Sequence, residues 1–157
     1  MKIPPSMTAE LQAWNNGKGT DLESWVSCVG NFSLAVGYAT IFWPKFVEFD
    51  GYILRDGFSE EILRSWELEN DRDRRAVERV MNHLHLTDIQ HYGCEDLSKD
   101  KIQLLGSTLE QIYKAKLNAD FPQTSCVVEF YRPENEDDLE QYQITFWQDE
   151  RPADESA

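Results

Sequence analysis

The chain has 157 residues, the usual length of one domain, and 41% of them are hydrophobic, which is enough for a core without disulfides or metals. Its 29 Asp and Glu residues outnumber its 15 Lys and Arg residues, giving a formal net charge of −14. This charge argues against binding of nucleic-acid backbones or anionic membranes by the surface as a whole, and it favours a basic protein partner.

The three cysteines, Cys28, Cys94 and Cys126, are odd in number and far apart, so reduced thiols in the cytoplasm are expected. Cys28 and Cys126 fall in apolar segments and are predicted to be inert core thiols. The first residues, MKIPPSMTAE, lack the apolar run of a signal peptide. We expect one globular domain over residues 8–148, with flexible termini at 1–7 and 149–157.

A short helix is predicted over residues 8–14. Between Thr20 and Trp43, apolar residues recur at spacings of three and four, which predicts one long helix that ends before Pro44. Residues 24–43 carry no charge and are long enough to span a bilayer, but their polar residues and two glycines favour a buried helix instead.

Residues 45–58 hold two apolar clusters around an Asp50–Gly51 turn signal, so either a short hairpin or an irregular helix fits them. Three further helices are predicted from capping residues and periodicity. They cover residues 59–70, 71–86 and 98–119.

Residues 126–131 and 142–147 alternate apolar and polar side chains on either side of a polar loop, which predicts an antiparallel hairpin. Because an isolated hairpin is marginally stable, it must pack on the helices or gain a third strand, for which residues 47–54 are a candidate. The expected fold class is α+β, with four or five helices packed with a C-terminal antiparallel β-hairpin or a three-stranded sheet.

In chain order, the sequence contains FWPKFVEFDGYIL, DRRAVERVMNHLHLTDI, IYKAKLNADFP, VVEFYRP and ITFWQ. These segments, spread over roughly residues 20 to 148, resemble a family of bacterial proteins of unknown function. The resemblance implies a stand-alone bacterial cytoplasmic protein. It brings no activity, so it assigns no functional residue.

The densest negative charge lies at the carboxyl end, where residues 133–157 hold nine acidic residues against the single Arg151. Five of these carboxylates fall in the loop of the predicted hairpin. They are Glu134, Glu136, Asp137, Asp138 and Glu140. Clustered carboxylates attract a basic partner, so the leading hypothesis is a non-catalytic binding protein of immunity-protein or inhibitor type. The alternative is a solvated loop without a partner.

A basic stripe is predicted on the helix over 71–86, where four residues share one side as a weak anion-binding candidate. They are Arg72, Arg75, Arg79 and His83. The competing interpretation is that the arginines pair with neighbouring carboxylates or with the acidic C-terminal region.

The alternative function is a small-molecule-binding protein or metal-dependent enzyme with a pocket near His83, His85 and Cys94. The segment HLHLTDIQH departs from the H-x-H-x-D-H pattern of metallo-β-lactamase-like hydrolases, because Asp88 falls one residue late. No metal site and no cofactor is therefore expected. A DNA mimic ranks lower, because the charge is concentrated in a loop and tail.

Overall fold

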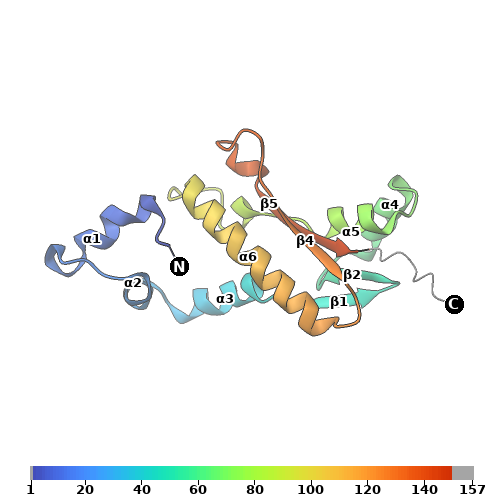
Figure 1. Cartoon of the computed structure of the whole chain (residues 1–157), viewed down its shortest axis with the longest axis horizontal. Helices are drawn as coiled ribbons and strands as arrows, with labels where there is room; N and C mark the ends of the chain where they lie inside the picture. The colour runs from blue at the N-terminus through green and yellow to red at the C-terminus, as the bar shows by residue number, and fades with distance from the viewer. Residues whose placement is uncertain (1, 150–157) are drawn as a thin grey trace.

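The computed structural model describes residues 2–149 and has an α+β fold (Figure 1). Within these residues it contains six α-helices, three short 3-10 helices and two antiparallel sheets. The elements are η1 (Pro5–Met7), α1 (Thr8–Gly17), α2 (Leu22–Val29), α3 (Phe32–Phe42), β1 (Phe46–Phe49), β2 (Tyr52–Arg55), α4 (Glu60–Glu69), α5 (Arg74–Met81), β3 (Leu84–His85), η2 (Leu86–Ile89), α6 (Lys99–Asp120), β4 (Cys126–Tyr131), η3 (Leu139–Gln141) and β5 (Gln143–Gln148).

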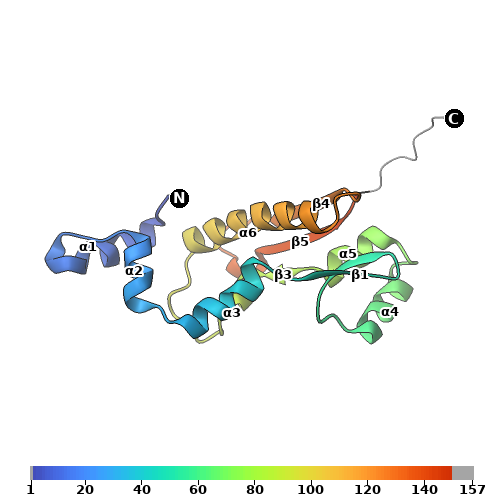
Figure 2. The same cartoon turned by 90° about the horizontal axis from the view of Figure 1, so that it is seen from below.

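The main core lies between α6 and a three-stranded sheet of order β3-β5-β4. Strands β4 and β5 form the predicted hairpin, with Val128 opposite Phe146. Helix α6 starts after Ser98, as predicted, and presents one apolar stripe to the sheet. The buried residues of this stripe include Ile102, Leu109, Tyr113 and Leu117. Figure 2 shows α6 over one face of β4 and β5, with α5 and the β1–β2 hairpin on the other side.

Gly106 permits a close contact between α6 and the sheet, because a Cβ atom built on it would overlap the ring of Phe130. We expect Gly106→Ala to lower the free energy of unfolding by about 2 kcal/mol, since overpacking outweighs the better helix propensity of alanine. Urea denaturation measures this change. The matched control is Gly37→Ala in α3, where a Cβ atom meets nothing within 4 Å, so that variant should be as stable as the wild type or more so.

Of the two structures predicted for residues 45–58, a hairpin or an irregular helix, the hairpin is correct: β1 and β2 pair antiparallel. Asp50 and Gly51 form its turn with φ of 49° and 82°, the left-handed angles that Asp-Gly turns supply. This hairpin is a sheet of its own, so the third strand of the main sheet is β3 and not a strand within 47–54.

Two buried polar side chains of α5 and its C-cap join the two sheets. The carboxylate of Glu78 accepts hydrogen bonds from the backbone N–H groups of Ile53 (2.7 Å) in β2 and Gln148 (2.6 Å) in β5. The amide of Asn82 donates to the carbonyls of Ile53 (2.8 Å) and Phe146 (3.2 Å) and accepts from the N–H of Arg55 (3.1 Å). These bonds replace the direct strand pairing that β2 and β5 lack.

The helix predicted over 71–86 is shorter than expected. It begins at Arg74, after the Asp73 side chain caps the N–H groups of Arg75 and Ala76, and it ends at Met81. Asn82 then bonds the neighbouring strands, and the chain continues as β3 and η2. Tertiary partners of Asn82 therefore outweigh the local helical pattern.

The long helix predicted over 20–43 is wrong in two respects. It is broken in two, because Gly30 is extended (ψ 173°) and Asn31 caps α3 by accepting from the N–H of Leu34 (2.9 Å). It is also exposed: Phe32 retains 92% of its accessible surface and Val36 retains 70%. Within residues 2–149, no helix is both long and apolar enough to cross a bilayer.

At the amino end, η1 contacts the start of α6 through Ser6, whose N–H donates to Asp100 (2.8 Å). At the carboxyl end, the N–H of Asp149 donates to the carbonyl of Ser125 (2.8 Å). The rest of the tail predicted to be flexible, residues 150–157, lies outside the described part of the chain. Three of the nine acidic residues of the carboxyl end, Glu150, Asp154 and Glu155, belong to it.

Candidate functional site

A cleft of about 920 Å³ opens between α3, the η2 turn, the first turns of α6 and η3. Its floor is apolar, because these elements meet at the edge of the main core. The apolar residues that line it are Phe42, Leu86, Ile89, Leu97, Ile102 and Leu105. On the α3 side, the hydroxyl of Tyr38 accepts a hydrogen bond from the amide of Gln90, which ties α3 to the turn after η2.

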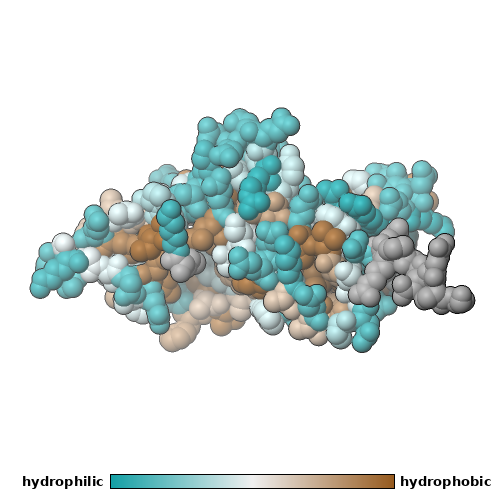
Figure 3. Space-filling view, viewed as in Figure 1, coloured by the Kyte–Doolittle hydropathy of each residue, from teal (hydrophilic) through white to brown (hydrophobic). Residues whose placement is uncertain are grey.

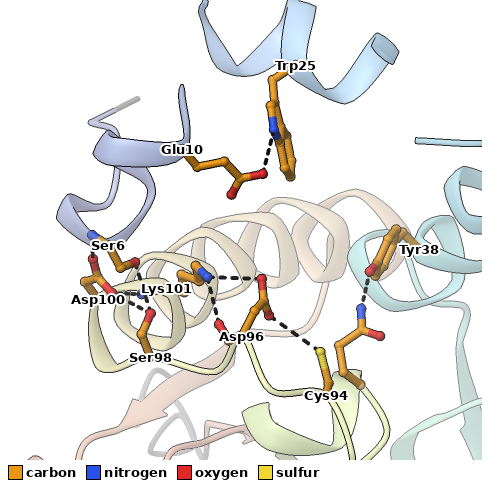
Figure 4. Close-up of polar contacts among 10 residues, drawn as sticks. Ser6, Glu10, Trp25, Tyr38, Cys94, Asp96, Ser98, Asp100 and Lys101 are labelled. Atoms are coloured by element: carbon orange, nitrogen blue, oxygen red, sulfur yellow. Dashed lines mark hydrogen bonds and ion pairs between the residues drawn. The ribbon is translucent and has the colours of Figure 1, made fainter. Parts of the chain in front are cut away.

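The charged residues that line the rim of the cleft are mostly acidic. Asp88, Asp96 and Glu140 line it together with a single cation, Lys101. The Lys101 ammonium donates to the Asp96 carboxylate (3.1 Å) and backbone carbonyl (2.7 Å), and this contact lowers the pKa of Asp96 (Figure 4). Asp96 therefore stays ionised at neutral pH, and two further carboxylates remain on the rim.

The acidic loop between β4 and β5 adjoins this rim. All five predicted carboxylates are exposed, and the loop projects from the body as a hydrophilic protrusion (Figures 1 and 3). The Nδ1–H of His85 donates to the carbonyl of Glu140 (2.8 Å), and the Tyr142 hydroxyl donates to the carbonyl of Glu136 (3.1 Å). The loop is thereby held in a fixed position beside the cleft.

One lysine partly neutralises the loop. Lys99 at the start of α6 pairs with Asp137 (2.9 Å) and Glu136 (3.6 Å), and these contacts raise the pKa of Lys99. Within residues 2–149, the other three carboxylates of the loop make no ion pair. These three are Glu134, Asp138 and Glu140.

The amino-terminal segment is attached beside the same end of α6 (Figure 4). Asp100 accepts from the N–H of Ser6 (2.8 Å), the hydroxyl of Ser98 (2.6 Å) and the N–H of Lys101 (3.0 Å). Hydrogen bonds of this kind stabilise the ionised carboxylate, and they lower the pKa of Asp100 to about 2. Asp100 thus adds a permanent negative charge near the cleft.

The histidines and Cys94 are divided between two hollows. His85, His91 and Cys94 line the cleft, whereas His83 lines a separate hollow of about 440 Å³ together with Arg79. The rings of His83 and His85 nevertheless pack edge to face, with 5.3 Å between their centroids. The Nδ1–H groups of His83 and His85 are both used by backbone carbonyls, and the Cys94 thiol lies 3.5 Å from Asp96. Among residues 2–149, no three His, Cys, Asp or Glu side chains gather as metal ligands would.

The other two cysteines differ from each other. Cys126 is half-buried, and burial raises the pKa of its thiol to about 11, as an inert thiol requires. Cys28, predicted to lie in the core, is exposed because α2 does not pack into the body.

The predicted basic stripe does not exist as a single helix face. Arg72 lies in the turn before α5 with φ of 60°, and His83 lies beyond the end of the helix. Arg75 and Arg79 stack on the ring of Trp147 at 5.1 and 4.8 Å. Arg79 also pairs with Glu129 of β4 at 2.9 Å, a partner that is distant in sequence. Anion binding by these side chains remains a prediction.

The alternative drawn from the sequence placed a pocket near His83, His85 and Cys94, and two of these residues, His85 and Cys94, line the cleft. Its other walls were not predicted, because Tyr38 and Gln90 are far apart in the chain and Lys101 and Asp96 gave no motif. A further signal was the apolar run that ends in Ile41 and Phe42, since these residues pack against the main core where α3 meets the body.

No protein-family model, curated protein or solved structure matches this chain. The resemblance to bacterial proteins therefore remains a prediction, and the geometry described above is the basis for the functional proposal.

Proposed function

We propose that this protein binds a basic, amphipathic segment of another protein in the cleft, in the manner of an immunity protein or inhibitor. One observation carries the proposal: a cleft with an apolar floor has an acidic rim that continues into the acidic β4–β5 loop. An amphipathic segment with apolar side chains on one face and Lys or Arg on the other is complementary to such a surface.

The two parts of the surface have different roles in this proposal. The apolar floor provides affinity, because apolar side chains that enter it leave water. The carboxylates orient the partner and raise its association rate. Glu134, Asp138 and Glu140 suit this role, because no ion pair within residues 2–149 occupies them.

We also propose a bacterial cytoplasmic setting. The exposed free thiols of Cys28 and Cys94 support it, because exposed thiols persist where the environment is reducing. The partner class is then a basic intracellular protein.

A synthetic amphipathic peptide of leucine and lysine at helical spacing tests the proposal. We expect the full-length protein to bind it more tightly than a scrambled peptide of the same composition, and to lose affinity as salt rises. Neutralising three loop carboxylates, Glu134→Gln, Asp138→Asn and Glu140→Gln, should weaken binding roughly tenfold at low salt. Fluorescence anisotropy of the labelled peptide measures both effects.

The matched control neutralises three exposed carboxylates away from the cleft, Glu61→Gln, Glu69→Gln and Asp71→Asn, and changes the net charge equally. This control should bind the peptide nearly as well as the wild type does. Equal weakening in both triple variants would contradict a localised site, and so would equal affinity for the scrambled peptide.

A small-molecule site in the same cleft is the second candidate. It is favoured by the cleft volume, which lies in the range of ligand sites, and by the positions of His85 and Cys94 on its wall. Binding of a small molecule would depend on His85 and Cys94, whereas binding of a basic protein segment would depend on the loop carboxylates.

A further inference from the structure

Residues 24–43 are the longest stretch without charge in a chain that holds 44 charged residues. They form most of α2 and all of α3, yet the body covers only a part of them. Side chains that remain at least 47% exposed are Val26, Val29, Phe32, Leu34, Val36 and Trp43. Hydrophobic surface gathers over this region in Figure 3.

Four exposed residues of α3 and its C-cap form one apolar stripe, whereas the exposed Leu34 lies on the other side of the helix. Phe32, Val36, Ala39 and Trp43 follow one another at spacings of four, three and four, which places them on the same side of a helix. The opposite side carries Ile41 and Phe42, which pack against the main core. One side of α3 is therefore anchored, and the other is apolar and open.

This open surface reaches the size of the largest apolar patch on a typical monomer, which is about 300–600 Å². Phe32 is 92% exposed and Trp43 is 58% exposed, which together gives on the order of 300 Å² from two aromatic side chains. Val36, 70% exposed, adds to them on the same side of α3. Exposed aromatic side chains of this kind are typical of interface centres.

We propose that the open apolar stripe of α3 forms a homodimer interface with the same stripe of a second copy of this chain. Two copies that each carry −14 repel one another over most of their surfaces, and the uncharged residues 24–43 are where they can approach without facing like charges. An apolar stripe is complementary to itself across a two-fold axis, as an isologous interface requires. The stripe side of α3 carries no carboxylate of its own, and it differs from the side that lines the cleft through Tyr38 and Phe42.

Sedimentation equilibrium of the full-length protein tests the proposal. The wild type should reach twice the monomer mass as its concentration rises, and sulfate should strengthen the dimer, because it strengthens apolar association. The double variant Phe32→Glu/Val36→Glu should weaken the dimer roughly a hundredfold. The matched control, Ile62→Glu/Leu68→Glu, adds the same charge at exposed apolar positions of α4 and should dimerise as the wild type does.

If circular dichroism shows that the double variant has lost its helices, Phe32→Ser replaces it, because a side chain that is 92% exposed contributes little to the monomer fold. A wild type that is monomeric at every concentration would overturn the proposal. A dimer that survives the α3 substitutions, or that dissociates equally with the α4 substitutions, would also overturn it. The Phe32→Glu/Val36→Glu variant should still bind the leucine–lysine peptide in the cleft. Dimerisation and peptide binding can therefore fail independently, which distinguishes this proposal from the proposed function.

Discussion

Replacing Glu78 by alanine should lower the free energy of unfolding by about 3 kcal/mol. The side chain is fully buried, and its two oxygens accept from the N–H of Ile53, the N–H of Gln148 and the side-chain amide of Gln148 (2.6 Å). Without the carboxylate, two buried backbone N–H groups in different sheets lose their acceptor. Equilibrium urea denaturation at neutral pH measures the change.

Glu110→Ala is the matched control. Glu110 pairs with Lys114 at 2.9 Å one turn along α6, and partly exposed i,i+4 pairs of this kind contribute about 0.5 kcal/mol or less. If Glu78→Ala and Glu110→Ala lowered the free energy of unfolding equally, the Glu78 carboxylate would not be what connects the two sheets.

Glu78 also makes the free energy of unfolding depend on pH, and the sign of this dependence follows from its pKa. Burial raises the pKa of Glu78 above its ordinary value of 4.5, although hydrogen bonds from Gln148 and Ile53 oppose the shift. The folded state thus binds the proton more tightly than the unfolded state, so this group favours folding most below pH 4.5 and less as the pH rises to its folded pKa. Glu78→Gln should remove this slope between about pH 4 and pH 7, whatever its effect on stability at neutral pH.

Replacing Asn82 by aspartate should destabilise the fold at neutral pH by about 3 kcal/mol or more. The Asn82 side-chain NH₂ group donates to the carbonyls of Ile53 and Phe146, and a carboxylate oxygen in its place would face two acceptors. Because burial and these carbonyls would favour the protonated acid, we expect part of the stability to return as the pH falls. Urea titrations at neutral and mildly acidic pH measure both effects.

Gln111→Glu, on the exposed side of α6, makes the same change of amide to carboxylate without burial. It should change stability by about 0.5 kcal/mol or less. An Asn82→Asp variant as stable as this control at neutral pH would contradict the bridging role of Asn82.

Local sequence signals were enough for several elements. Ser59 caps α4 by accepting from the N–H of Ile62 (3.3 Å), and α6 and the β4–β5 hairpin follow their apolar periodicity. In these segments the local preference and the tertiary packing agree. The α+β fold class followed from them and is confirmed.

Other features depend on partners that are distant in the chain. The end of α5 is decided by the bonds of Asn82 to β2 and β5, and the position of the acidic loop by the bond from His85 to Glu140. The apolar periodicity of residues 24–43 predicts helices. It does not determine whether their apolar side packs against the core of the same chain or against a second molecule.

The sequence by itself determined the negative charge, the fold class and most helix and strand positions, because these follow from composition and from contacts between near neighbours. Only the tertiary structure decided where the cleft opens, which carboxylates surround it and which apolar surface stays uncovered. Those properties arise where distant segments come into contact. Tyr38 and Gln90 are 52 residues apart, His85 and Glu140 are 55 residues apart, and no local sequence pattern predicts such contacts.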